Sequence, residues 1–282
     1  MTVELAPITD ADLGEVADFL SVNHNDRVPW ESACATVPWK VDAPNHGFML
    51  RDGPNVVGTL LALYSQRRVA GQVERFCNMG SWCVLSDYRA RSMSLLDALL
   101  AQDGYHFTVL SPDDGPREIL SWRKFRFLDT SAALIPNLPW PTVPSRTRVS
   151  SDPQVIARTL TGVEFDLYRD HAHALAARHL VVLRGQESCY VMYRKCRYKG
   201  IPVFAIVLHV SNPGLFQRAL MPLTRHLLVR HGLVATLAEL RLIERRPRMS
   251  FELDSWPKMY RSADLEPAQI DDLYSELVCV PW

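Results

Sequence analysis

The most informative segment of the chain is Trp82-Cys-Val-Leu-Ser-Asp-Tyr-Arg-Ala-Arg-Ser-Met-Ser-Leu-Leu96, where an apolar strand runs into a turn and then an amphipathic helix. The first turn of a helix has amide N–H groups without intrahelical acceptors, and the helix dipole adds partial positive charge. Small side chains at this point let an anion approach the backbone, and Arg89 and Arg91 add mobile positive charge. The segment therefore predicts a pyrophosphate site. The alternative is an ordinary first helical turn with solvated arginines.

The elements around this segment predict an α+β fold, a mixed α/β arrangement in which a mostly antiparallel central sheet is flanked by helices. Apolar residues recur at helical spacing in some segments and cluster into short strand-like runs in others. In the first half we expect helices at 9–22, from 29, at 88–102 and at 116–125, and strands at 47–50, 56–64, 81–85, 105–110 and 127–134.

A proline-rich segment, Ile135-Pro-Asn-Leu-Pro-Trp-Pro-Thr-Val-Pro144, divides the chain. Proline cannot continue a helix or donate within a central strand, so we interpret the segment as an extended linker. The second half repeats much of the first half's element order, which favours an internal duplication over a chance likeness. We therefore expect an N-terminal domain at 1–138, a linker at 139–150 and a C-terminal domain at 151–282.

Composition and charge narrow the class of protein. The chain has 282 residues, and its 31 basic and 31 acidic residues cancel. Nucleic-acid binders usually carry a basic excess, so we expect no nucleic-acid partner. The six cysteines form no C-x-x-C pair, and we expect reduced thiols and no metal site. We see no secretion signal and no membrane-spanning run, which favours a cytoplasmic protein.

The segment at 82–96 resembles motif A of the GCN5-related N-acetyltransferases (GNAT family), written L-x-V-x-P-x-Y-R followed by R/Q-x-x-G-x-G/A. Trp82, Val84, Ser86, Tyr88 and Arg89 take the strand and turn positions, with Ser86 in place of the motif's proline. The loop is Arg89-Ala-Arg-Ser-Met-Ser94, in which serines replace the glycines. The family's ending, Y-x-K-x-G-F, resembles Trp122-Arg-Lys-Phe-Arg-Phe127.

The resemblance implies a tandem of two GNAT-like domains, the second a degenerate copy that has lost CoA, because 209–218 lacks the arginine-led loop. It implies a cytoplasmic enzyme that transfers an acetyl or short acyl group from CoA to an amine of a small molecule or protein by direct attack. Acetyl-CoA or another acyl-CoA is then the co-substrate, without a metal, and a homodimer stays open. The cofactor-binding residues that it implies are Cys83, Val84, Leu85, Arg89, Ala90, Arg91, Ser92, Met93 and Ser94.

Such a reaction needs a general base, because an ammonium must lose a proton before it attacks a thioester. Glu74, Cys77, Asn78 and Ser81 precede or flank the motif strand, and His106 is an alternative on the following strand. Glu74 can equally be a solvated loop residue paired with Arg75, and His106 a satisfied, partly buried histidine.

The resemblance also implies a backbone donor for the oxyanion, here Leu85 or Val84, and a tyrosine that protonates the leaving thiolate. Trp122 takes that tyrosine's position and cannot act as an acid. Tyr88, Tyr105 or water would act instead, or CoA would leave as a thiolate. Two other classes of function stay open: a non-catalytic acyl-CoA sensor, and a binding protein without CoA.

Overall fold

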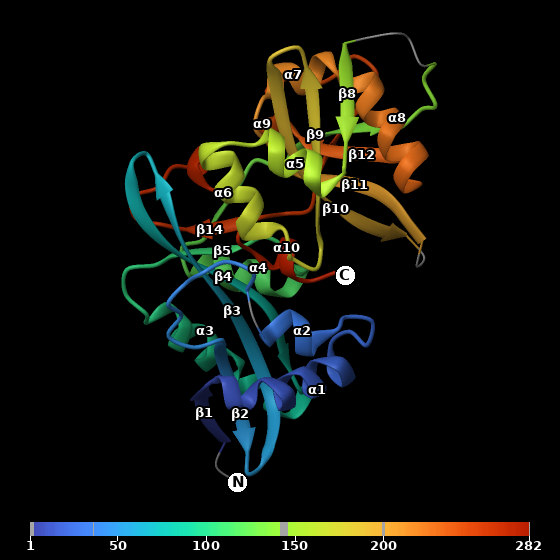
Figure 1. Ribbon diagram of the computed structural model, residues 1–282. Helices are drawn as coiled ribbons and strands as arrows, with labels where there is room; N and C mark the ends of the chain where they lie inside the picture. The colour runs from blue at the N-terminus through green and yellow to red at the C-terminus, as the bar shows by residue number, and fades with distance from the viewer. Residues whose placement is uncertain (1–2, 36, 142–145, 199–200, 282) are drawn as a thin grey trace. The chain divides into compact units, whose positions relative to one another are not determined.

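The computed structural model describes residues 3–35, 37–141, 146–198 and 201–281 (Figure 1). Its contacts form two compact units. The first comprises Met1–Leu128, Lys258–Ile270 and Tyr274–Trp282, and the second Asp129–Pro257 and Asp271–Leu273. Each unit has its own sheet of seven strands within the described residues, so the expected α+β class with two mostly antiparallel sheets is confirmed.

The first sheet has the strand order β1-β2-β3-β4-β5-β14-β6. Every neighbouring pair is antiparallel except β4 and β5, which run parallel. The strands are β1 (Val3–Pro7), β2 (Gly47–Asp52), β3 (Asn55–Val69), β4 (Gln72–Val84), β5 (His106–Val109), β6 (Arg126–Phe127) and β14 (Met259–Arg261).

The helices of the first unit are α1 (Leu13–Asn23), α2 (Trp30–Ala35), α3 (Ser92–Leu100), α4 (Asp114–Trp122) and α10 (Glu276–Cys279), with 3-10 turns η1 (Asp10–Asp12), η2 (Ser86–Arg91) and η3 (Pro267–Gln269). Apolar side chains of α3 pack on the sheet because Leu95, Leu96 and Leu99 recur at helical spacing and are fully buried. This packing holds α3 against β2 and β3, and η2 connects the helix to the end of β4.

The second sheet has the order β13-β7-β12-β11-β10-β9-β8, and its only parallel pair in the described chain is β11 with β12. Its strands are β7 (Ser131–Pro136), β8 (Thr147–Ser150), β9 (Ala177–Arg184), β10 (Glu187–Tyr198), β11 (Ile201–Val210), β12 (Ala235–Glu239) and β13 (Phe251–Asp254). Its helices are α5 (Pro153–Thr159), α6 (Gly162–His171), α7 (Pro213–Arg218), α8 (Leu220–His231) and α9 (Leu240–Ile243).

The two sheets share one plan. Among the described strands each has a single parallel pair, and the second strand of that pair is followed in the sheet by an antiparallel strand from a distant part of the sequence. In the first sheet that strand is β14, and in the second it is β7. This repeated topology supports the expected duplication.

The units differ from the division expected from the sequence. The strand expected at 127–134 is two strands in different sheets, since β6 joins the first and β7 the second. Residues 258–270 and 274–282 belong to the first unit. The expected linker at 139–150 contains β8, which pairs with β9, and its residues 142–145 lie outside the described residues. In the proline-rich segment before it, β7 extends to Pro136, which pairs with Ala235.

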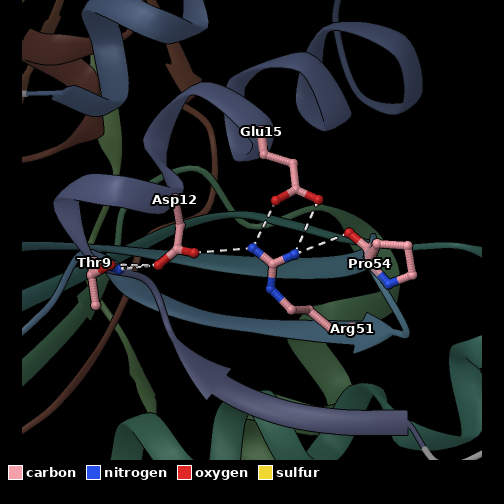
Figure 2. A network of polar contacts seen from close by, with 5 residues as sticks. All are labelled: Thr9, Asp12, Glu15, Arg51 and Pro54. Atoms are coloured by element: carbon pink, nitrogen blue, oxygen red, sulfur yellow. Dashed lines mark hydrogen bonds and ion pairs between the residues drawn. The ribbon is translucent and has the colours of Figure 1, made fainter.

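An ion-pair network ties the start of α1 to the β2–β3 hairpin (Figure 2). The Arg51 guanidinium donates to both Glu15 oxygens at 3.1 and 2.7 Å and to Asp12 Oδ1 at 3.0 Å. It also donates to the Pro54 carbonyl at 3.1 Å. The other Asp12 oxygen accepts from the Thr9 amide and hydroxyl, and these hydrogen bonds lower the pKa of Asp12.

Candidate functional site

The parallel pairing of β4 with β5 is short. It covers Phe76 with His106, Cys77 with Phe107 and Asn78 with Thr108, and then stops although β4 continues to Val84. Beyond Asn78, the edge of β4 that faces away from β3 therefore has no strand partner in the described chain. Backbone groups on such an edge are free to pair with an extended ligand.

A bulge in β4 contributes to this separation. The register with β3 shifts between Thr59 and Leu61, and Ser81, opposite the shift, has a φ of +50°. Ser81 is buried, so its side chain is a structural part of the bulge. In the described chain, the structure records no hydrogen bond between the Ser81 side chain and any other expected catalytic residue.

The two expected oxyanion donors, the amides of Val84 and Leu85 at the end of β4, point in opposite directions. The Leu85 amide donates to the Val57 carbonyl at 3.0 Å, so it points toward β3 and is occupied. Successive amides of a strand point to opposite sides, so the Val84 N–H faces the unpaired edge. Of the two expected donors, Val84 alone has the orientation that the role needs.

The expected anion site begins directly after this strand. Here the sequence-based helix at 88–102 is corrected, because 86–91 form the 3-10 turn η2 and the α-helix starts only at Ser92. Arg89, Ala90 and Arg91 are exposed, whereas Ser92, Met93 and Ser94 are half-buried, as are Cys83, Val84 and Leu85. The Ser94 hydroxyl donates to the Arg91 carbonyl at 2.6 Å, within the first turn of the helix.

Neither Arg89 nor Arg91 has a side-chain hydrogen bond or ion pair within the described chain, and both guanidinium groups are open to solvent. The turn is therefore neither filled by a neighbouring side chain nor directed into the core. An anion from solvent can reach the two arginines and the start of α3.

A second polar group lies near the start of the parallel pair. Glu74 accepts from His106 Nε2 at 3.0 Å, and the Ser262 hydroxyl lies 2.9 Å from His106 Nδ1. Glu74 is on strand β4, so the alternative that it is a loop residue is wrong. The structure thus brings together Glu74 and His106, and it adds Ser262, which the sequence did not point to.

A third group lies where β4 and β5 part. Asn78 is buried and donates to the Thr108 carbonyl and hydroxyl, and its Oδ1 accepts from the Glu276 amide at 2.8 Å. Glu276 Oε1 accepts from the Leu110 amide at 3.1 Å and the Ser111 hydroxyl at 3.0 Å. Glu276 is 1% exposed, and its Oε2 has no hydrogen-bond partner in the described chain.

Sequence reasoning missed Glu276. Burial raises the pKa of its carboxyl group above that of an ordinary glutamate. Gly80 on β4 lies beside it, since a Cβ there would be in ordinary van der Waals contact with Glu276 Cβ at 3.5 Å. The only sequence signal is a carboxylate that directly precedes an apolar run, Leu277 to Val280.

The tyrosines and Trp122 are placed as follows. Tyr88 donates to Asp52 at 2.6 Å, and this hydrogen bond raises the pKa of Tyr88, which makes it a weaker acid. The Tyr105 hydroxyl accepts from Arg75, whose guanidinium also lies 4.1 Å from the Tyr105 ring centroid. Trp122 is 86% exposed at the end of α4.

The corresponding place in the second unit is built differently. There the helix after the parallel strand is the six-residue α7, and Asn212 Oδ1 caps it by accepting from the Leu215 amide. No arginine precedes this helix at the position that corresponds to Arg89. The loss of CoA binding in this half rests on that difference and stays a prediction.

Two further observations concern metals and membranes. Within the described residues, no group of three or more His, Cys, Asp or Glu side chains could hold a metal ion. No helix in the described residues combines the length and the apolar character that crossing a bilayer requires.

Comparison with known proteins gives structural neighbours but no sequence relatives. No protein-family model matches the chain, and no curated protein sequence matches it. A GCN5-related N-acetyltransferase from Anabaena variabilis aligns with a TM-score of 0.58 at 12% identity, over 92% of this chain and 72% of that one. A probable N-acyltransferase from Enterococcus faecalis also gives 0.58, at 13% identity over 95% and 74%.

Saccharomyces cerevisiae N-myristoyltransferase with bound myristoyl-CoA aligns with a TM-score of 0.51 at 11% identity, over 97% of this chain and 83% of that one. At such identities the likeness concerns the fold alone. Because these alignments cover nearly the whole chain and both sheets, the chain has the fold of two GNAT-like domains in tandem.

Proposed function

We propose that the chain is an acyltransferase that moves an acetyl or short acyl group from CoA to an amine by direct attack, with CoA bound to the first unit. The observation that carries the proposal is the opening of the sheet beyond Asn78, directly before an exposed turn with two unpaired arginines. In the proposal, Arg89, Arg91 and the start of α3 bind the diphosphate, and the free edge of β4 pairs with the pantetheine amides.

Glu276 is the general base in this proposal. Its carboxylate lies between β4 and the residues after β5, at the closed end of the opening, and one of its oxygens is free to accept a proton. A general base works best when its pKa lies near the operating pH, and the burial of Glu276 shifts its pKa in that direction. Asn78 would position it through the 2.8 Å hydrogen bond to its amide.

The reaction then proceeds in a single acyl transfer. The ammonium of the acceptor gives a proton to Glu276, the neutral amine attacks the thioester carbon, and the oxyanion accepts from the Val84 amide. A C–N bond forms and the C–S bond breaks. CoA leaves as a thiolate, because Tyr88 is held by Asp52 and does not serve as the acid. The attacking nitrogen loses its second proton as the amide forms, and this proton passes through solvent to the departing thiolate.

Glu74 with His106 is the alternative base, as the sequence suggested. The pair lies at the other end of the parallel pairing, next to Phe76, where β4 and β5 are still joined. A base at this position would need an acceptor that approaches from the start of β5. The two candidates are separated by comparing Glu276→Gln with Glu74→Gln.

A non-catalytic acyl-CoA sensor is the second candidate function. The burial of Glu276 and the presence of Trp122 where the resemblance places the acid tyrosine favour it, because both features disfavour proton transfer and not CoA binding. A sensor would bind acetyl-CoA but release no thiol with any acceptor.

The test measures binding and turnover separately. Thermal shift with acetyl-CoA reports binding, and release of free thiol from acetyl-CoA with amino acids, polyamines and amino sugars reports transfer. We expect binding in the wild type and in both variants, and a fall in kcat of about 10²–10⁴-fold in Glu276→Gln but not in Glu74→Gln. Unchanged turnover in Glu276→Gln would show that Glu276 is not the base. If acetyl-CoA did not raise the melting temperature of the wild type, the whole proposal would be wrong.

A further inference from the structure

The second unit contains a cavity that the proposed acyl transfer does not use. It has a volume of about 1000 Å³ and lies between β8, the end of β9 and one face of α8. The strand β8 and the helix α8 pack against each other in this unit (Figure 1). All the residues that line the cavity belong to the second unit.

The charges around this cavity are predominantly positive. Five arginines line it: Arg148, Arg184, Arg218, Arg225 and Arg230. Asp152 is the carboxylate among the lining residues that the structure describes, and its Oδ1 accepts from the Gln154 amide as a helix cap. The five arginines come from β8, β9, α7 and α8, so it is the fold that brings them together.

Only one of these arginines is neutralised. Arg218 donates to Glu187 at 2.6 Å. The side chains of Arg148, Arg184, Arg225 and Arg230 form no hydrogen bond or ion pair within the described chain. Like charges that face one cavity repel each other, and a bound polyanion would remove that repulsion.

His226 on α8 does not add to the charge. Burial, the neighbouring His231 and Arg230 lower its pKa to about 4, so it is neutral at physiological pH. Its Nε2 lies 3.3 Å from the Ser151 hydroxyl. The neutral imidazole and this hydroxyl can donate or accept hydrogen bonds next to the arginines.

We propose that this cavity binds a small molecule carrying several phosphate groups, held by Arg148, Arg184, Arg225 and Arg230. Arginine suits the role because its planar guanidinium donates two parallel hydrogen bonds to phosphate oxygens. The diphosphate site at Arg89 and Arg91 is in the other unit, so this is a second anion site and does not depend on the acyltransferase proposal.

The test is calorimetric titration of the full chain with ATP, with inorganic tripolyphosphate and with adenosine, without divalent metal. We expect the first two to bind and adenosine not to. The double variant Arg148→Ala/Arg225→Ala should weaken both at least tenfold. The charge-matched control Arg245→Ala/Arg248→Ala, which changes two exposed arginines outside the cavity, should bind as the wild type does.

Two further double variants test whether a loss of binding comes from unfolding or from binding in the first unit. If thermal melting shows that the first double variant is unfolded, Arg184→Ala/Arg230→Ala replaces it with the same expectation. Arg89→Ala/Arg91→Ala should retain ATP binding, and its loss there would place the phosphates in the first unit. Absence of binding, equal binding of adenosine, or binding unchanged by the cavity variants would each overturn the proposal.

Discussion

The amide of Glu276 donates a 2.8 Å hydrogen bond to Asn78 Oδ1, across 198 positions of sequence. Both residues belong to the first unit, and the hydrogen bond fixes the C-terminal segment against the strand that carries the GNAT-like motif. The consequence is that a buried carboxylate from near the end of the chain lies where β4 and β5 separate. A site built this way depends on the last residues of the chain as much as on the motif.

Glu276 should reduce stability at neutral pH. Burial raises its folded pKa above the ordinary glutamate value of 4.5, so the folded state binds a proton more strongly than the unfolded state does. Stability from this residue is therefore full below pH 4.5 and falls as the pH rises toward the folded pKa. We expect Glu276→Gln to match the wild type at pH 4 and to exceed it at pH 7 by about 1–3 kcal/mol.

Urea unfolding at several pH values measures this difference. Glu74→Gln is the control, since it changes a carboxylate that is partly exposed and paired with His106. A Glu276→Gln variant that is less stable than the wild type at pH 7 would show that its carboxylate is stabilising there. A base kept at a cost in stability is typical of a functional residue.

A fragment that ends at residue 138 should not fold as the first unit. It lacks β14, which pairs with both β5 and β6, and it lacks Glu276, which accepts from the Leu110 amide. Without β14, β5 becomes an edge strand whose buried face is exposed. We expect the fragment to aggregate or to melt without a cooperative transition, measured by circular dichroism. A cooperative melt like that of the full chain would contradict the conclusion that the first unit needs residues 258–270 and 274–282.

Replacing Arg89 and Arg91 together should abolish acetyl-CoA binding without affecting the fold. Both side chains are exposed, and neither forms a hydrogen bond or ion pair in the part of the chain that the structure describes. At about 100 times its dissociation constant, a ligand adds roughly 2.7 kcal/mol of stability, which thermal shift detects. The matched control is Arg27→Ala/Arg68→Ala, which removes two exposed arginines elsewhere in the first unit. If acetyl-CoA still raised the melting temperature of Arg89→Ala/Arg91→Ala, the proposal that these two arginines bind the diphosphate would be wrong.

The motif and the local pattern were sufficient to predict the fold class. The strand–turn–helix at 82–96 is present, and Leu95, Leu96 and Leu99 form its buried face as their spacing predicts. One hairpin was missed, because β3 and β4 are joined at Ala70 and Gly71, both with positive φ. Asn-Gly or Asp-Gly is the usual signal for that turn, and alanine gives no such signal.

The sheet that each of the strands β7 and β14 joins could not be predicted from local sequence patterns. Nothing in Ser131–Pro136 or Met259–Arg261 indicates which sheet each strand joins, because pairing is decided by contacts between distant residues. The same limit hid Glu276, which reaches Asn78 only through tertiary structure. Glu74 and His106 were named separately from the sequence because both lie close to the motif strand. Their mutual contact appears only in the structure, and a catalytic role for either stays a prediction.

Acid should weaken the network at the start of α1 (Figure 2). Hydrogen bonds from Thr9, followed by Arg51, hold the pKa of Asp12 below its usual 3.8. Its contribution is present above pH 3.8 and is lost as the pH falls through the folded pKa. Asp12→Asn should cost about 1 kcal/mol between pH 5 and 7, and the difference should shrink below pH 4. Chemical unfolding across this range checks it, and a difference that does not change with pH would rule out the charge on Asp12 as the cause.

Gly47 and Gly53 lie at opposite ends of β2 and should respond very differently to a methyl group. Both have positive φ, +111° and +58°, so alanine strains the backbone at each. At Gly53 a Cβ meets nothing within 4 Å, and we expect a cost of about 1 kcal/mol. At Gly47 the Cβ would lie 2.1 Å from the Leu60 carbonyl oxygen, which is backbone of the neighbouring strand β3 and cannot rotate away. Gly47→Ala must therefore push β2 from β3 and cost more than about 3 kcal/mol. Equal unfolding free energies for the two variants, measured by urea titration, would show that β2 and β3 are not so closely packed.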